Sequence, residues 1–242
     1  MDTAYFDQHD YAIRCEWGAD GIAALGPLSD VIIIVDVLSF STCVDIAVGN
    51  GAIIYPYRWS DTTAEHYAQS LDALLAAAHR SSPDGYSLSP ASLQRIPTGT
   101  RLVLPSPNGA TLSHATGTTP TIAGSLRNAP AVAHAAQTLG QSISVIPAGE
   151  RWADGRLRPA LEDWIGAGAI IADLTGTRSP EAEVAVAAFQ RAQHDLMSYL
   201  AGCSSGRELI ERGFAEDVRL AAGFNQSACV PLLTNNAYVR HA

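Results

Sequence analysis

The segment VIIIVDV, residues 31–37, is the most informative stretch for the fold. Its first five residues are all β-branched and follow one another without polar alternation. Such a run is typical of a strand that is buried on both faces, as in a mostly parallel sheet covered by helices. Asp36 comes directly after the run, so the segment predicts a buried strand that ends in a carboxylate.

Other short apolar runs alternate with amphipathic or alanine-rich segments along the chain. We predict strands over residues 11–17, 31–37, 52–57, 101–105, 120–124 and 142–148. We predict helices over residues 40–51, 62–80, 128–139, 159–174, 179–201, 204–212 and 216–223. This order of elements indicates a single-domain three-layer α/β/α sandwich over residues 1–242, with a mostly parallel central sheet.

Two segments lie outside this alternation. Residues 81–99 form one long polar stretch, and a loop of that length inside a compact domain is usually functional or disordered. Residues 229–242 are expected to form a surface segment that packs back on the domain.

Composition narrows the class of protein. The chain has 242 residues, of which 47% are hydrophobic, and this is enough for one large core. A net charge of −9 argues against nucleic acid or an anionic membrane as the main partner, although a local pocket can still bind a small anion. No apolar run is long enough to span a bilayer, and the acidic start is unlike a secretory signal.

These features predict a cytoplasmic protein. The four cysteines show no zinc-ligand spacing, and we interpret them as reduced thiols. The alanine-rich helices at 128–139 and 180–201 are compatible with either an internal position or a homodimer interface.

Polar residues gather where the predicted strands end, which is where open α/β sheets bind ligands. Asp36 follows the 31–35 run, and Glu162 and Asp163 lie near the next helix start after the last predicted strand. Each has a structural alternative, because Asp36 is also a plausible helix cap and acids at a helix start complement the helix dipole. The functional interpretation is a set of hard oxygen ligands for Mg²⁺.

The segment SPNGAT, residues 106–111, has two interpretations as well. Pro-Asn-Gly is an ordinary turn sequence. At a helix start, however, the backbone N–H groups and the hydroxyls of Ser106 and Thr111 make an anion site, and Gly109 permits close approach.

The segment GSLRN, residues 124–128, follows the same logic. Arg127 is either solvated or a guanidinium whose paired N–H donors bind phosphate, sulfonate or carboxylate.

Glu150 and Arg151 form either a weak surface ion pair or part of the ligand site. The sequence contains no GxxxxGK[ST] or GxGxxG motif, and its histidines show no ligand spacing. Together the strand-end residues favour metal-assisted chemistry on a phosphorylated acid.

Six blocks resemble the 2-phosphosulfolactate phosphatase family, in order from about residue 31 to 233. The blocks are VDVLSFSTCV (35–44), SPNGAT (106–111), GSLRNA (124–129), AGER (148–151), EDWIGAGAI (162–170) and SGRELIERGFAEDV (205–218). The resemblance implies a three-layer α/β/α fold and a Mg²⁺-dependent phosphatase acting on phosphate esters of small 2-hydroxy carboxylic acids. The eponymous substrate is 2-phospho-3-sulfolactate, in coenzyme M biosynthesis. The positions that match the family motifs are Asp36, Asn108, Gly109, Ser125, Asn128, Glu162 and Asp163.

The chain also departs from the family pattern. The first block usually reads Asp-Val-Leu-Arg, and here Ser39 takes the arginine position. A Gly-Gly-Glu-Arg block is missing between residues 52 and 80, and a later block is shortened to GYSLSP (85–90). The family's Thr-Thr-Asn-Gly-Thr has become SPNGA. We hypothesise that Arg127 replaces the lost positive charge.

Two functions follow. The first is a Mg²⁺-dependent phosphatase for a small anionic phosphorylated substrate, in which Asp36, Glu162 and Asp163 are catalytic and hold the metal. The substrate would contact Ser106, Asn108, Gly109, Ser125, Arg127, Asn128 and Arg151. The second is a repurposed or non-catalytic family member that binds a small phosphorylated or anionic metabolite.

Overall fold

The computed structural model describes residues 4–58, 61–80 and 85–241. Within this part of the chain, one nine-stranded sheet has the strand order β1-β7-β2-β6-β10-β11-β3-β5-β4. Its strands are β1 Ile13–Cys15, β2 Val31–Val35, β3 Ile53–Tyr57, β4 Leu74–Leu75, β5 Arg101–Pro105, β6 Thr121–Gly124, β7 Ile143–Pro147, β10 Pro231–Thr234 and β11 Ala237–Arg240. A separate hairpin pairs β8 Glu150–Arg151 with β9 Leu157–Arg158.

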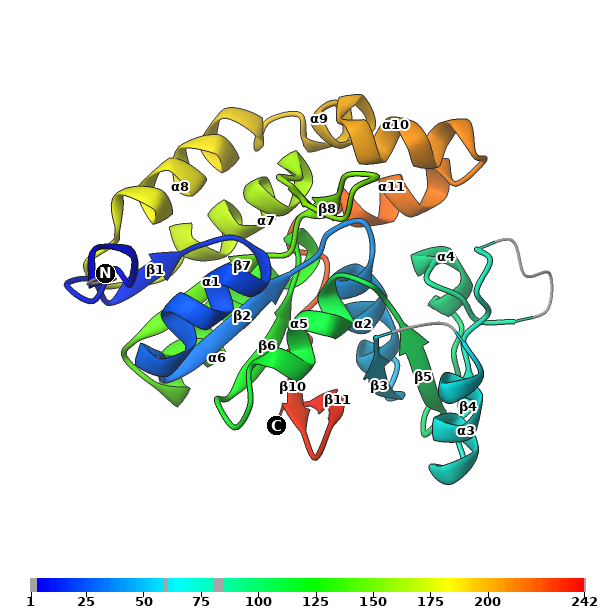
Figure 1. Cartoon of the computed structure of the whole chain (residues 1–242). Helices are drawn as coiled ribbons and strands as arrows, with labels where there is room; N and C mark the ends of the chain where they lie inside the picture. The colour runs from blue at the N-terminus through cyan, green and yellow to red at the C-terminus, as the bar shows by residue number, and fades with distance from the viewer. Residues whose placement is uncertain (1–3, 59–60, 81–84, 242) are drawn as a thin grey trace.

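Helices cover both faces of the sheet (Figure 1). They are α1 Gly18–Leu25, α2 Phe40–Gly49, α3 Thr62–Ser70, α4 Pro90–Leu93, α5 Gly109–Ala115, α6 Ala129–Leu139, α7 Leu161–Ala172, α8 Pro180–Ala192, α9 Leu196–Gly202, α10 Ser204–Glu211 and α11 Ala215–Ala221. The predicted α/β/α architecture with a mostly parallel sheet is therefore confirmed.

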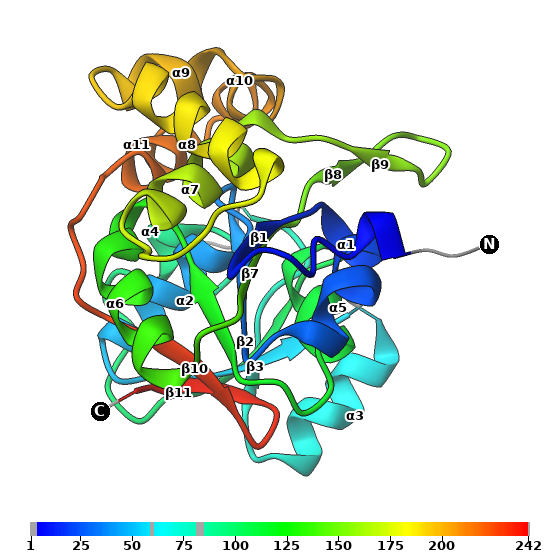
Figure 2. The same cartoon turned by 90° about the vertical axis from the view of Figure 1, so that its left-hand side faces the viewer.

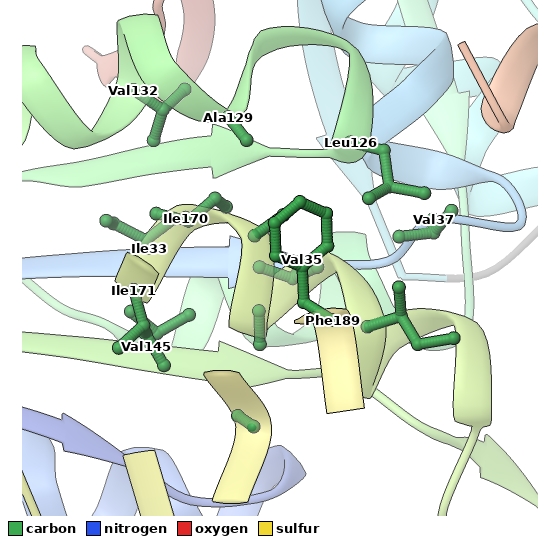
Figure 3. Packing of buried hydrophobic residues seen from close by; sticks show 14 of the residues in the cluster. Ile33, Val35, Val37, Leu126, Ala129, Val132, Val145, Ile170, Ile171 and Phe189 are labelled. Carbon is green, nitrogen blue, oxygen red and sulfur yellow. The ribbon is translucent and has the colours of Figure 1, made fainter. Parts of the chain in front are cut away.

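Strand β2 lies inside the sheet because its whole run is apolar. It pairs in parallel with β7 on one side and with β6 on the other, and all five of its side chains are fully buried. Alternate side chains point to opposite faces, so Ile33 and Val35 pack with α6, α7 and α8 (Figure 3), whereas Ile32 and Ile34 pack with α1 and α5. Each fully buried aliphatic side chain contributes roughly 1.5–3 kcal/mol of transfer free energy.

The sheet consists of two parallel blocks joined by the C-terminal hairpin. The first block is β1-β7-β2-β6 and the second is β3-β5-β4. Strands β10 and β11 lie between the blocks and pair antiparallel with β6 and β3. The expectation that residues 229–242 form a surface segment was therefore wrong for β10 and β11, which occupy an internal position in the sheet.

Several predicted boundaries change in the structure. The helix expected over 62–80 ends at Ser70, because Asp72 adopts a left-handed backbone with φ 49° and Leu74–Leu75 then pair with β5. The helix expected over 179–201 is broken between α8 and α9, where the Asp195 side chain accepts a hydrogen bond from the Ser198 N–H and starts a new helix.

Helix α1 was not expected from the sequence. The stretch 81–99 contains the short helix α4, and its residues 81–84 lie outside the described part.

No helix in residues 4–58, 61–80 or 85–241 is long and apolar enough to cross a membrane. The four cysteines are buried and unpaired.

Candidate active site

Asp36 lies at the carboxyl end of β2 and joins two helix starts. Its Oδ1 accepts a hydrogen bond from the backbone N–H of Phe40 at 3.1 Å, and its Oδ2 accepts one from the N–H of Gly109 at 2.8 Å. The first contact satisfies a donor at the start of α2, so the capping alternative for Asp36 describes part of its role. The side chain is buried, and burial raises the pKa of Asp36 while the two N–H donors lower it.

The SPNG turn brings β5 to the same place. Ser106 Oγ accepts a 3.3 Å hydrogen bond from the Asn108 N–H, which closes the turn before α5. Gly109 fits because a Cβ there would lie 2.3 Å from Phe40 Cδ1 and 2.8 Å from Asp36 Oδ2. The Gly109 N–H already binds Asp36, so the anion at this helix start is a carboxylate of the chain itself.

Asp163 ties the end of β2 to the segment after β7. Its Oδ1 accepts a hydrogen bond from the Val37 N–H at 2.7 Å, and its Oδ2 accepts one from the Gly149 N–H at 2.9 Å. Burial and the neighbouring Asp36 and Glu162 carboxylates raise the pKa of Asp163 well above its ordinary value. Both oxygens are engaged by backbone donors, which gives Asp163 a clear structural role beside Asp36.

Glu162 precedes Asp163 in the first turn of α7 and is 2% exposed. It lies beside the thiol of Cys203, whose pKa is raised to about 12 by burial and then by the Glu162 charge. Among the described residues, no backbone N–H binds the Glu162 carboxylate, in contrast to Asp36 and Asp163. Its oxygens therefore have the capacity to bind an additional group.

Glu150 joins Asp36, Glu162 and Asp163 in one group of carboxylates, which we call the acidic cluster. Its Oε2 accepts a 2.9 Å hydrogen bond from Asn108 Nδ2, which links the β8 strand to the SPNG turn. Burial raises the pKa of Glu150 to about 7, and the charges of Asp36 and Glu162 act in the same direction. Glu150 and Arg151 do not form the surface ion pair considered from the sequence, because Arg151 instead donates to the Gly155 carbonyl at 3.0 Å.

The cluster has more negative than positive charge. Asp36, Glu150, Glu162 and Asp163 act on one another electrostatically. Two cations offset them in part: Arg80 lowers the pKa of Asp36, and Arg158 lowers the pKa of Glu150. Buried charges of one sign need a compensating partner, and a divalent cation with oxygen ligands meets that need.

This donor set fits Mg²⁺ in the way that proteins usually hold it. In the described part of the chain, no three His, Cys, Asp or Glu side chains form a ready-made metal cage. Mg²⁺ commonly binds through one or two carboxylates and keeps several water ligands, so such a cage is not required. Glu162 is suited to that role because no backbone N–H in the described residues binds its carboxylate. Asp36 and Asp163 each accept two such bonds, and their oxygens keep further lone pairs for a cation.

Asn108, Glu150 and Arg151 line one cavity of about 440 Å³. The cavity lies against the β8–β9 hairpin, which projects from the body of the protein (Figure 2). Its wall also includes Trp17 of the segment before α1 and Arg156 of the hairpin. A small anionic molecule at this position would meet both carboxylate and guanidinium groups.

Ser125 and Asn128 lie in a closed hydrogen-bond network at the end of β6. The Asn128 Oδ1 accepts from the Ser125 N–H at 2.8 Å, and its Nδ2 donates to the carbonyls of Ala123 and Cys229. Both side chains are fully buried. This motif holds the C-terminal segment against β6, and its polar groups already have partners within the protein.

Arg127 lies in a different environment from the acidic cluster. Its Nε is 2.8 Å from Asp45 Oδ2, and its Nη1 donates to the Leu220 carbonyl at 3.3 Å. It lines a second cavity, which Asn108, Glu150 and Arg151 do not line. The structure thus brings Asp36, Asn108, Gly109, Glu162 and Asp163 together, but it pairs Arg127 with Asp45.

Sequence reasoning missed two residues of the cluster and left Glu150 open between a surface ion pair and part of the ligand site. The place of Glu150 three residues after β7 was the signal for the second alternative. Arg158 lies four residues before Glu162, and nothing in its sequence context marked it. Arg80 lies just before residues 81–84 and contacts Ser39, which only the structure could show.

The fold and the site together define a class, an α/β/α enzyme with an acidic centre at the strand ends. More particularly, the chain belongs to the 2-phosphosulfolactate phosphatase family. The family model described as 2-phosphosulpholactate phosphatase matches residues 22–236. A curated relative, the probable 2-phosphosulfolactate phosphatase of Carboxydothermus hydrogenoformans, is 32% identical over 208 residues, which cover 83% of this chain and 84% of the relative. The resemblance found in the sequence blocks is confirmed, and the chain is a phosphatase, a hydrolase of phosphoric monoesters.

Proposed function

We propose that this phosphatase hydrolyses the phosphate ester of a small 2-hydroxy acid, with 2-phosphosulfolactate as the first candidate substrate and Mg²⁺ as cofactor. The observation that carries the proposal is a cluster of four carboxylates at the ends of β2 and β7 and the start of α7, of which three are buried and Glu150 is half-buried. The substrate name comes from the relative and the family, whose descriptions both refer to this compound.

Asp36 and Glu162 would hold the metal, with Asp163 fixing the backbone around them. When bound, Mg²⁺ supplies charge neutralisation for the phosphoryl oxygens. Asp36 is oriented for this task because two N–H donors fix its carboxylate. Phosphoryl transfer depends mainly on positioning and charge stabilisation, and a rigid, buried carboxylate suits both needs.

The remaining groups would shape the substrate site. Asn108 holds Glu150 in place, and the Arg151 side chain lines the adjoining cavity. Guanidinium groups match the geometry of phosphate, sulfonate and carboxylate. The proposed substrate carries these anionic groups on one small skeleton, which agrees with a site where cations border a metal-binding cluster.

The test is inorganic phosphate release from a panel of esters, assayed with Mg²⁺ and with EDTA. The panel contains 2-phosphosulfolactate, 2-phospholactate and phosphoglycolate. We expect release from at least one ester with Mg²⁺ and loss of that release with EDTA. Equal release in EDTA would overturn the Mg²⁺ part of the proposal.

A second function, binding of a phosphorylated acid without turnover, is favoured by one observation, the serine at position 39. This function predicts that the esters raise the melting temperature while no phosphate is released. The same panel therefore separates the two functions.

A further inference from the structure

Arg80 is a cation of the acidic cluster to which the proposed chemistry gives no role. Its Nη1 donates to Ser39 Oγ at 3.1 Å and to Asp217 Oδ2 at 3.2 Å. The Arg80 side chain is 13% exposed, so it is largely enclosed but still reachable from solvent. Ser39 lies three residues after Asp36, and the Arg80 charge acts on the Asp36 carboxylate, so this guanidinium lies near the candidate metal ligands.

The guanidinium is fixed from behind by Asp217. Asp217 is 1% exposed, and its Oδ1 accepts hydrogen bonds from Ser89 Oγ at 2.6 Å and from the Ala91 N–H at 3.1 Å. Its other oxygen is the one that binds Arg80. The carboxylate is thus locked by the start of α4 and offers Arg80 a rigid anchor.

The backbone of Arg80 is fixed as well. Its carbonyl accepts a hydrogen bond from Ser87 Oγ at 3.1 Å, and Ala77 forms a bridge with Ser87. These contacts tie Arg80 to Ser87 in the first half of the polar stretch 81–99. A side chain held at both ends loses little conformational freedom when it binds a ligand.

The guanidinium has donors to spare. Both of its hydrogen bonds within the described residues come from Nη1, which leaves Nε and Nη2 without protein acceptors there. A largely enclosed guanidinium, with N–H groups that no described residue accepts from and next to the proposed phosphoryl site, is suited to binding an oxyanion.

We propose that Arg80, held by Asp217 and Ser39, binds the second anionic group of the substrate and so determines the preference for phosphorylated acids over simple phosphate esters. The inference rests on the proposed function. The ligand chemistry is a carboxylate or sulfonate on the short skeleton that bears the phosphate. Asp217 is a positioning residue in this arrangement, since it acts through Arg80.

The experiment compares wild type with Arg80→Ala and Arg80→Lys on two esters. The first, 2-phospholactate, carries a carboxylate, and the second, isopropyl phosphate, has a methyl group in its place. For Arg80→Ala we expect the KM for the carboxylated ester to rise roughly 10- to 100-fold, as for a lost charge-assisted hydrogen bond, with little change in kcat. The KM for isopropyl phosphate should stay near the wild-type value.

Arg80→Lys is the control for misfolding. It keeps a positive charge opposite Asp217 but lacks the planar guanidinium and its paired N–H donors. We expect it to melt close to wild type and to show a smaller rise in the KM for the carboxylated ester. Arg95→Ala, an exposed arginine between α4 and β5, is the matched control and should change neither ester. Equal effects of Arg80→Ala on the two esters would show a purely structural role and overturn the proposal.

A binding measurement separates this proposal from the proposed function. The affinity of sulfolactate, the dephosphorylated acid, is measured by calorimetry in wild type and in Arg80→Lys. Weaker binding in Arg80→Lys supports the role of Arg80 even if wild type releases no phosphate from any ester. Unchanged affinity, or no binding of sulfolactate to wild type, overturns it.

Discussion

Single residues at the strand ends of this phosphatase combine structural and chemical roles. Asp36 accepts hydrogen bonds from the starts of α2 and α5 and also belongs to the acidic cluster. Asp163 joins the backbone after β2 to the backbone after β7 in the same way. The same hydrogen bonds therefore position the acidic cluster and hold the strand ends together. A substitution that disturbs the strand ends is expected to disturb the cluster as well.

Gly109→Ala tests this link. The added Cβ would collide with Phe40 and Asp36, so we expect a loss of about 1–3 kcal/mol in the free energy of unfolding, together with reduced phosphate release. Gly202→Ala is the control, because no atom lies within 4 Å of a Cβ there. Denaturant unfolding measures both variants, and a fully stable Gly109→Ala would contradict the close contact.

Arg127→Met tests the role that the structure gives Arg127. The change leaves the buried Asp45 carboxylate with Ser227 Oγ as its remaining side-chain partner, so we expect a loss of about 3–5 kcal/mol in the free energy of unfolding. Arg212→Met removes an exposed pair with Glu208 and should cost under ~1 kcal/mol. A raised KM with unchanged stability would instead support the sequence-based hypothesis that Arg127 binds substrate.

Residue patterns predicted part of the site and not the rest, for physical reasons. Asp36, Asn108, Gly109, Glu162 and Asp163 follow strands or open helices, so their meeting point could be predicted from strand ends alone. Ser125 and Asn128 share that placement, yet their polar groups bind within the protein, to the turn after β6, to the Ala123 carbonyl and to the Cys229 carbonyl. Arg80 reaches the site from a loop, and loop side chains carry no periodic signal.

At the scale of elements, the hairpin β10–β11 is the main departure from the predicted fold. The signal for it was present in the pair Asn235-Asn236, whose φ values of 51° and 62° suit a two-residue hairpin turn. The helix expected over 62–80 was predicted too long. Nothing in the composition of this segment marks the short strand β4, which follows the helix in the structure. Strand pairing over long sequence distances decided both cases.

Tyr238 tests the importance of the hairpin. Its ring is fully buried, and its hydroxyl lies 2.7 Å from Ser113 Oγ on α5. We expect Tyr238→Ala to lower the free energy of unfolding by about 3–5 kcal/mol and Tyr238→Phe to lower it by about 1 kcal/mol. The exposed Tyr5 provides the control, because Tyr5→Ala should be close to neutral in the same unfolding experiment. A neutral Tyr238→Ala would argue against an internal hairpin.

At the scale of the whole molecule, the acidic cluster adds a pH dependence to stability. Glu150 has an ordinary pKa of 4.5 and a pKa of about 7 in the folded protein, chiefly because of burial. Between these values the folded state holds a proton that the unfolded state has lost, so stability falls as pH rises through this window and levels off above about 7.

We therefore expect the metal-free protein to be less stable at pH 8 than at pH 5, with Glu150 contributing up to ~3 kcal/mol of the difference. Urea unfolding in EDTA measures this difference. Glu150→Gln removes the titrating group and should flatten the profile. The same slope in Glu150→Gln would show that another group is responsible.

The homodimer interface stays one of two alternatives for the alanine-rich helices, and the cytoplasmic location stays a prediction. The chain is acidic, with a net charge of −9, and among its described residues the buried carboxylates Asp36, Glu162 and Asp163 gather at one edge of the sheet. We propose that this cluster is the phosphatase centre.

The most direct test is the rate of phosphate release from 2-phosphosulfolactate by wild type and by Asp36→Asn in excess Mg²⁺, with melting curves showing that both are folded. We expect release by wild type and a loss of ~100-fold or more in Asp36→Asn. Release by a folded Asp36→Asn at the wild-type rate would contradict the proposal.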